Sequence, residues 1–268
     1  MTRIGNLFAR LASRGEKGLI AYITAGDPHP DRTPSLVAAL ERGGADLVEL
    51  GAPFSDPIAD GPVIQAASDR ALRAGTTLAK VLDIARRIRA GSEIPLLLFS
   101  YLNPLLRYGF EALARDAAAA GIDGCLLTDL SVEEADESVT VLRRAGLDTV
   151  FLGAPTSTPQ RLAKVAQFSS GFVYVVSRAG VTGERESLSS AVAPLVEAMR
   201  GVTSLPLAVG FGISRPEHAA EVVRMADAVV VGSAFVRIVE SAAGAASLET
   251  QLEGFARELK HAISRKET

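Results

Sequence analysis

The sequence contains one cysteine, Cys125, only three histidines and no tryptophan. A lone cysteine excludes an internal disulfide, and no histidine has a second His or Cys at ligand spacing, so we expect no metal site. This thiol content is typical of a protein from the reducing cytoplasm. Because Cys125 lies within an apolar run, we predict a core position for it rather than a nucleophilic role.

The chain also lacks an excess of one charge and any long apolar run. Its 28 Lys and Arg residues against 31 Asp and Glu leave a formal net charge of −3, and no basic block is dense enough for a nucleic-acid binder. No apolar stretch reaches the roughly 20 residues that span a bilayer. The most apolar stretch, 94–106, is interrupted by two prolines. We therefore expect neither nucleic acid nor a membrane as a partner.

Short apolar runs alternate with longer amphipathic stretches, a pattern typical of βα units around a parallel sheet. The 268 residues are 48% hydrophobic, which is enough for one large core, and no linker divides them. We predict an α/β fold with one domain over residues 1–268, a single (β/α)8 TIM barrel. The expected strands are Leu19–Thr24, Asp46–Leu50, Pro95–Phe99, Gly124–Leu127, Thr149–Leu152, Phe172–Val176, Leu207–Val209 and Ala228–Val231.

The amphipathic stretches predict helices, several of which end at glycine, as helix C-termini commonly do. We also expect an extra N-terminal helix, because apolar residues recur at helical spacing over 4–11, and a last helix over 248–259. The long connections 51–62 and 177–190 leave room for extra short helices in the βα loops. The other expected helices are Pro34–Arg42, Leu78–Arg89, Phe110–Ala120, Val132–Ala145, Pro159–Gln167, Ala191–Met199 and Pro216–Met225.

Glu49 lies among apolar residues in a strand whose two faces should both be buried. A carboxyl group there either points into the barrel mouth, with its pKa raised by burial so that it works as acid and base, or pairs with an arginine. The following loop, 51–61, carries Asp56 and Asp60 and is restrained by two prolines. Such a loop can present a carboxylate to a ligand, although an aspartate before proline or glycine is also an ordinary turn residue.

Glycine-containing loops follow the last two expected strands, at Gly210–Ser214 and Gly232–Ala234, and each opens a helix. Barrels commonly build a phosphate site from these two loops, since backbone N–H groups at a helix start bind anions and glycine allows close approach. A third loop, Gly180–Gly183, could close over the ligand. Each glycine alone could be a helix cap or a turn, but the two positions together favour phosphate.

The five lysines lie before the first expected strand or in helical stretches, so none is placed at a strand end to form a Schiff base. Since the histidines supply no metal cluster either, carbon–carbon cleavage at this face would have to proceed by carboxylate acid–base catalysis.

Several motifs together resemble the tryptophan synthase alpha subunit family, over nearly the whole chain. The most specific is VELGAPFSDPIADG at 48–61, and shorter ones lie at 6–8, 26–28, 101–104, 177–183 and 210–214. The resemblance implies a barrel that cleaves indole-3-glycerol phosphate to indole and glyceraldehyde 3-phosphate, a retro-aldol reaction that needs no cofactor in this chain.

By motif position, the resemblance implies that Glu49 is the general acid and base, and that Asp60 stabilises positive charge on the indole ring or removes the proton of its N–H group. It implies substrate contacts as well. Tyr22, Phe99, Leu126, Leu152 and Phe211 would wall the indole pocket, Tyr174 would lie beside Glu49 or the substrate, Thr182 would meet Asp60, and Gly183, Gly212, Gly232 and Ser233 would hold the phosphate.

The resemblance further implies a partner, the pyridoxal-phosphate-containing beta subunit, in an α₂β₂ assembly that passes indole between active sites. Pro53 and Asp56 would contact it. The chain departs from the motif pattern at Ala25 and Ala52, where larger apolar residues are expected.

Two alternatives stay open. One is another phosphate-binding barrel enzyme of aromatic biosynthesis, such as an isomerase or indole-glycerol-phosphate synthase, although the synthase would need a lysine at a strand end. The other is a non-catalytic phosphate-binding subunit, against which the presence of both Glu49 and Asp60 argues.

Overall fold

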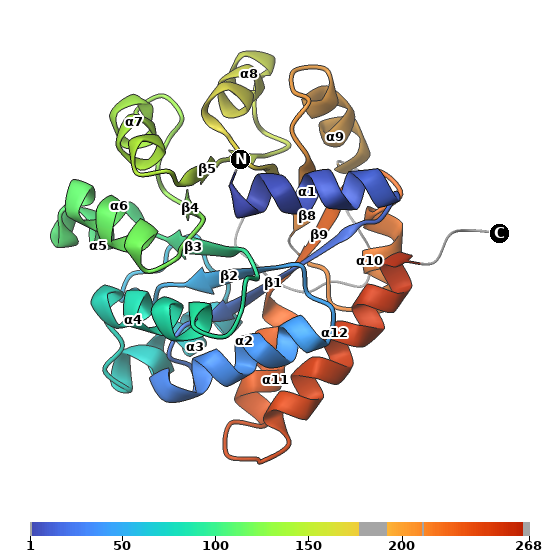
Figure 1. Cartoon of the computed structure of the whole chain (residues 1–268). Coiled ribbons are helices and arrows are strands. Elements are labelled where there is room, and N and C mark those ends of the chain that lie inside the picture. The colour runs from blue at the N-terminus through green and yellow to red at the C-terminus, as the bar shows by residue number, and fades with distance from the viewer. Residues whose placement is uncertain (1, 177–191, 211, 265–268) are drawn as a thin grey trace.

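The computed structural model describes residues 2–176, 192–210 and 212–264 of the chain. Parallel strands form a barrel with helices around it (Figure 1). Within the described residues the strand order is β5-β4-β3-β2-β1-β9-β8-β7-β6. The strands are β1 (Gly18–Thr24), β2 (Leu47–Gly51), β3 (Leu96–Ser100), β4 (Gly124–Leu127), β5 (Asp148–Val150), β6 (Leu152–Gly153), β7 (Val173–Val176), β8 (Leu207–Gly210) and β9 (Ala228–Val231).

The two ends of this sheet, β5 and β6, are halves of one extended segment, the predicted strand at 149–152. Its first half pairs with β4 and its second half with β7, and the Phe151 carbonyl between them accepts from Tyr174 N–H at 3.1 Å. The segment thus changes its pairing partner part-way along, as the stagger of strands in a barrel requires. The predicted eight-stranded barrel is confirmed.

The helices largely match the predicted stretches. The helix α7 is shorter than expected at its start and α10 at its end, and η1, α3 and α5 lie in βα loops. The helices are α1 (Arg3–Arg14), η1 (Pro30–Arg32), α2 (Thr33–Arg42), α3 (Pro62–Arg73), α4 (Leu78–Arg89), α5 (Leu102–Tyr108), α6 (Phe110–Ala119), α7 (Asp136–Arg144), α8 (Pro159–Phe168), α9 (Val192–Arg200), α10 (Pro216–Val222), α11 (Ser233–Ser241) and α12 (Leu248–Ser264). None of these described helices has the length and apolar character needed to cross a membrane.

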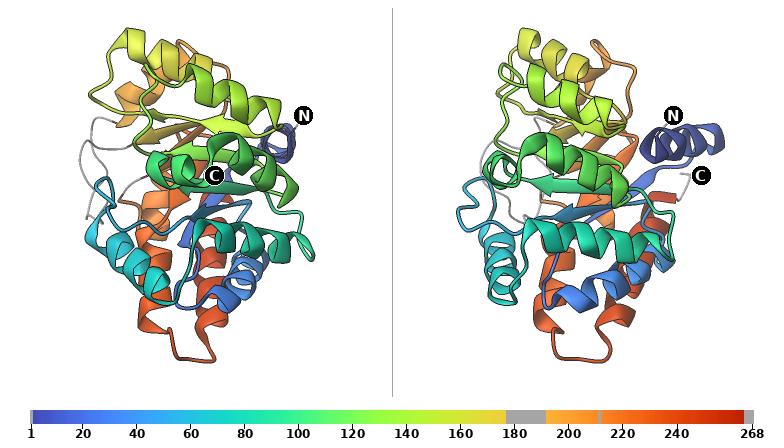
Figure 2. Two further views of the ribbon diagram at one scale, coloured as in Figure 1. Left: turned by 90° about the vertical axis from the view of Figure 1, so that its left-hand side faces the viewer. Right: turned by 60° about the vertical axis from the view of Figure 1, so that its left-hand side comes forward.

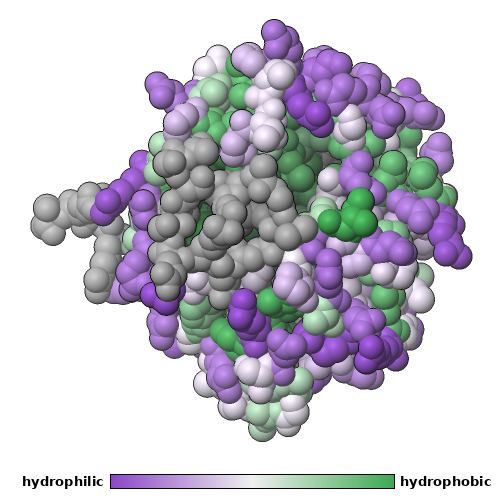
Figure 3. Space-filling view, turned by 180° about the vertical axis from the view of Figure 1, so that it is seen from behind, coloured by the Kyte–Doolittle hydropathy of each residue, from purple (hydrophilic) through white to green (hydrophobic). Residues whose placement is uncertain are grey.

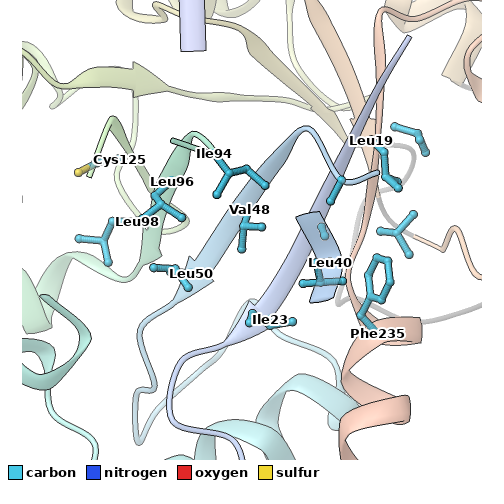
Figure 4. Packing of buried hydrophobic residues seen from close by; sticks show 14 of the residues in the cluster. Leu19, Ile23, Leu40, Val48, Leu50, Ile94, Leu96, Leu98, Cys125 and Phe235 are labelled. Atoms are coloured by element: carbon cyan, nitrogen blue, oxygen red, sulfur yellow. The ribbon is translucent and has the colours of Figure 1, made fainter. Parts of the chain in front are cut away.

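Side chains point alternately outward and inward along the strands, and this divides the buried residues into an outer and an inner core. The outer core lies between strands and helices, where Val48, Leu50 and Leu96 face the surrounding layer (Figure 4). Cys125 belongs to it, and burial raises the pKa of its thiol to about 12, which confirms the predicted core position. An inert thiol of this kind takes no part in catalysis.

The inner core fills the barrel and is closed at one end by α1 (Figure 2). The apolar face of α1 belongs to the same cluster as the inward side chains of the strands, and Phe8 contacts Phe172 with ring centroids 5.6 Å apart. The predicted N-terminal helix is confirmed. Because α1 covers the end at which the strands begin, a ligand site is expected at the other end, where the strands end.

Candidate active site

The candidate site lies where the strands end, at the face opposite α1. Glu49 on β2 stands beside Tyr22 on β1 in the sheet register. Its side chain is 1% exposed, and its Oε1 atom has no hydrogen-bond partner. Among the described residues no arginine pairs with it, so the alternative of a paired strand-end glutamate is not supported. Burial raises the pKa of Glu49 to about 8, and the carboxyl group is therefore mainly protonated at neutral pH.

Asp60 is the second buried carboxyl group, 4% exposed at the end of the loop 52–61. Burial raises its pKa to about 6, against the opposing effect of a hydrogen bond from the Tyr101 hydroxyl to Oδ2 at 2.9 Å. The backbone of Asp60 is held as well, since the side-chain amide of Gln65 donates to the Asp60 carbonyl at 2.8 Å. At neutral pH, Asp60 is mainly ionised while Glu49 is mainly protonated.

Two buried tyrosines, Tyr22 and Tyr174, are close enough to both carboxyl groups to feel the charge of each. The pKa of each phenol is raised, first by burial and then by the charges of Asp60 and Glu49. Each phenol therefore lies within reach of both acids, and these four side chains converge in the barrel mouth.

Glycines at the strand ends make the room that these tyrosines occupy. A Cβ atom added to Gly51 would lie 2.2 Å from the Tyr22 hydroxyl, and one added to Gly210 would lie 2.1 Å from that of Tyr174. Any side chain at either position would displace the neighbouring phenol, so glycine here is part of the site.

The structure also places the predicted indole wall inside the barrel. Tyr22 and Phe99 meet edge to face, with centroids 5.2 Å apart and planes at 76°. Tyr22, Phe99, Leu126 and Tyr174 belong to the inner core, and the half-buried Leu152 packs against it. Thr182, Gly183 and Phe211, which the sequence also predicts at the site, lie outside the described residues.

The predicted phosphate loops emerge side by side, because β8 and β9 are paired. Gly212 has a φ angle of 82°, which favours glycine. Gly232 is the N-cap of α11 and supplies no side chain to the helix start, while Ser233 begins the helix. The N–H groups of the first turn have no intrahelical acceptor, so this helix start can bind an anion.

The outward part of the loop 52–61 carries the residues predicted to contact a partner. Pro53 is half-buried and Asp56 exposed. Next to Asp56, Ile58 is 78% exposed, and Leu106 on α5 is 58% exposed. Figure 3, which views the face opposite that in Figure 1, shows hydrophobic residues reaching the surface near the middle, with hydrophilic residues around the periphery.

Sequence reasoning assigned no role to Tyr101, although its motif was noted. The only available signal was an aromatic hydroxyl directly after a strand end, which does not reveal that it reaches the loop 52–61. In the part of the chain that the structure describes, no three His, Cys, Asp or Glu side chains gather to hold a metal ion.

Comparison with known proteins decides the family. The model of the family "Tryptophan synthase alpha chain" matches residues 8–264. The chain belongs to the tryptophan synthase alpha chain family. A curated alpha chain from Solibacter usitatus is 68% identical over 260 residues, covering 97% of both chains. An alpha chain from Citrifermentans bemidjiense is 51% identical, covering 98% of both.

Solved structures agree with the family assignment. The alpha subunit from Legionella pneumophila superposes with a TM-score of 0.91 at 38% identity, covering 98% of both chains. A chain of tryptophan synthase from Mycobacterium tuberculosis gives 0.91 at 36% identity, covering 99% of both.

The reaction of the family is the retro-aldol cleavage of indole-3-glycerol phosphate, so the chain is a carbon–carbon lyase of tryptophan biosynthesis, as its motifs predicted. This excludes the alternative of a different barrel enzyme. Retention of both buried carboxyl groups, Glu49 and Asp60, favours the lyase over a non-catalytic subunit. An alpha chain also implies a beta chain as its partner.

Proposed function

We propose that Glu49 and Asp60 divide the cleavage of indole-3-glycerol phosphate between them, without a cofactor in this chain. The observation that carries this proposal is the burial of both carboxyl groups in one barrel mouth, which raises the pKa of Glu49 to about 8 and that of Asp60 to about 6. One carboxyl group is protonated and the other ionised over the same pH range. When their environments give two carboxyl groups different pKa values, one can act as an acid while the other is charged.

Protonated Glu49 gives its proton to the indole ring carbon that bears the side chain. This breaks the aromaticity of the ring and leaves a positive charge centred on the ring nitrogen, which the Asp60 carboxylate stabilises through a hydrogen bond from the indole N–H. The Glu49 carboxylate then takes the proton of the adjacent glycerol hydroxyl. As that C–O group becomes an aldehyde, the carbon–carbon bond breaks and its electron pair restores the ring, so Glu49 ends protonated again.

The walls of the barrel mouth support this chemistry. We propose that Tyr22, Phe99, Leu126, Leu152 and Tyr174 hold the indole ring, with Phe211 completing the wall and Thr182 meeting Asp60. Apolar walls exclude water, and the exclusion strengthens the attraction between the Asp60 carboxylate and the charged ring.

We assign the phosphate group of the substrate to Gly183, Gly212, Gly232 and Ser233. Ser233→Asp places a carboxylate at the start of α11, where it repels the phosphate. We expect at least about a tenfold rise in KM, with kcat changed much less, because the charge acts on binding rather than on the ring. Steady-state assays of indole release measure both constants.

Ser247→Asp is the matched control, because Ser247 is exposed and directly precedes another helix, α12. Its kinetics should equal those of the unmodified chain. An unchanged KM in Ser233→Asp would contradict the phosphate assignment.

We further propose that the loop 52–61, with Pro53 and Asp56, docks on a beta chain in an α₂β₂ assembly, together with the exposed side chains of Ile58 and Leu106. Pyridoxal phosphate would belong to that partner, which would receive indole directly. A shared passage suits an apolar product that would otherwise diffuse away. The single buried thiol is consistent with assembly in the cytoplasm.

The experiment that tests the proposed function is indole release from indole-3-glycerol phosphate by the purified chain and by Asp60→Asn, with and without a beta chain. We expect slow release by the chain alone, faster release with the beta chain, and at least about a hundredfold loss in the variant, since an amide cannot balance the ring charge. Full activity of Asp60→Asn would show that its proposed role is wrong.

A further inference from the structure

We propose that Tyr101 is a positioning residue for Asp60, whose hydroxyl group fixes the carboxylate and the loop that carries it in one reactive arrangement. The proposal rests on the function proposed above for Asp60. It concerns a residue that supplies neither acid nor base to the substrate and that acts through another side chain.

The contacts of Tyr101 reach three residues of the loop 52–61. Its hydroxyl donates to Asp60 Oδ2 at 2.9 Å and accepts from the Ala59 N–H at 3.0 Å. Its ring lies against Phe54, with centroids 5.2 Å apart and planes at 36°. Tyr101 is 3% exposed, so water competes little for these bonds. One side chain thus holds both the outward and the inward part of the loop.

The backbone around Tyr101 is itself fixed, which lets the ring act as a rigid support. Tyr101 is the N-cap residue of α5 and follows the end of β3. The next N–H, that of Leu102, donates to Asp129 Oδ1 at 2.7 Å. The start of the loop is tied to the same strand, since Ala52 N–H donates to the Phe99 carbonyl at 2.8 Å.

The hydrogen-bond partners of the Tyr101 oxygen determine where its single proton points. A phenol has one proton to donate, and its oxygen accepts through lone pairs. The Ala59 N–H donates to this oxygen, and an ionised carboxylate such as that of Asp60 can only accept, so the phenol proton is directed at Asp60 Oδ2. The hydrogen bond therefore favours the ionised carboxylate, which the proposed charge stabilisation requires.

Two other phenols among the described residues act on the same region through the charges of the two acids. The charge of Asp60 raises the pKa of Tyr22 on β1 and of Tyr174 on β7, and the charge of Glu49 has the same effect on both. Among the hydrogen bonds of the described residues, that from Tyr101 is the one given to the Asp60 carboxyl group. It opposes the effect of burial and so lowers the pKa of Asp60.

Tyr101→Phe tests the proposal, because it keeps the ring beside Phe54 and removes only the hydroxyl. Losing a hydrogen bond to a charged group should lower kcat for cleavage by about 10- to 100-fold. KM should stay within about twofold of that of the unmodified chain. The acidic limb of the pH profile should move to higher pH, because Asp60 loses the donor that favours its charged form. An acidic limb at its original pH would overturn the proposal.

Tyr108→Phe is the matched control. Tyr108 makes the same contact, from its hydroxyl to Asp116 Oδ2 at 2.9 Å, on the outer helices α5 and α6. Losing this hydroxyl should leave kcat, KM and the pH profile unchanged. Equal kinetic losses in the two variants would show that Tyr101 has only a structural role.

A second measurement separates this proposal from that for Asp60 itself. Titration of ¹³C-labelled aspartate carboxyl groups by NMR, with Asp60 assigned from Asp60→Asn, should show a higher pKa for Asp60 in Tyr101→Phe. An unchanged value would overturn the positioning role even if activity falls. In kinetics, Tyr101→Phe should cost nothing further once Asp60→Asn is present. An additive loss would overturn the proposal, whereas full activity of Asp60→Asn alone would instead overturn the function proposed for Asp60.

Discussion

Glu49→Gln is expected to lower the rate of indole release by about 10²- to 10⁴-fold, the usual contribution of one general acid–base group. Glutamine nearly matches glutamate in shape but can neither give the ring carbon a proton nor take one from the glycerol hydroxyl. Substrate affinity should change little, because the role of Glu49 is realised in the transition state. The measurement is single-turnover indole release at saturating substrate, with and without a beta chain.

The pH profile gives the same prediction a second, independent form. The active state requires ionised Asp60 and protonated Glu49, so the rate should rise as Asp60 loses its proton near pH 6 and fall as Glu49 does near pH 8. The small activity left in Glu49→Gln should lack the alkaline limb. If that limb persisted in the variant, the titrating group would not be Glu49.

Glu111→Gln is the matched control, because Glu111 is an exposed glutamate on the outer helix α6. We expect its rate and both limbs of its pH profile to equal those of the unmodified chain. A comparable loss there would show that the assay responds to the overall charge of the protein rather than to the site.

The fold was largely predictable from sequence because the buried strands are short apolar runs with clear boundaries. Gly124–Leu127 and Ala228–Val231 agree with the structure to the residue. The helix α3 was missed because its buried residues include Ala67, Ser68 and Ala71, which give a weak apolar pattern. Its start at Pro62, after a glycine N-cap, was the available signal.

Site residues on strands were predictable for a similar reason. A glutamate among apolar strand residues is unusual and therefore marks a candidate site in the sequence. In the structure, the Glu49 Oε1 atom has no hydrogen-bond partner. Asp56 and Asp60 are different, since both precede turn-forming residues in one loop and look alike in sequence. The structure separates them, with Asp56 exposed and Asp60 buried under the hydroxyl of Tyr101. That contact joins residues 41 positions apart, and local pattern carries no information about it.

The same burial that prepares Glu49 for catalysis should cost the protein stability as pH rises. Burial raises the pKa of Glu49 to about 8 in the folded chain, against an ordinary value of 4.5 for a glutamate in water. Between these values the folded state keeps a proton that the unfolded state has released. The free energy of unfolding contributed by this group therefore falls as pH rises through that range, and the fall is complete above pH 8.

Glu49→Gln removes this titration, so the variant should gain stability relative to the unmodified chain as pH rises from 5 to 9. Because one pKa unit corresponds to 1.36 kcal/mol, the relative gain should be on the order of 4 kcal/mol. Urea unfolding followed by circular dichroism at several pH values measures it, and taking the difference between the two chains cancels their other titrating groups. In Glu111→Gln the difference from the unmodified chain should stay constant with pH. If the two curves of Glu49→Gln and the unmodified chain ran parallel, Glu49 would be ionised in the folded protein at neutral pH, and it could not be the acid that protonates the indole ring.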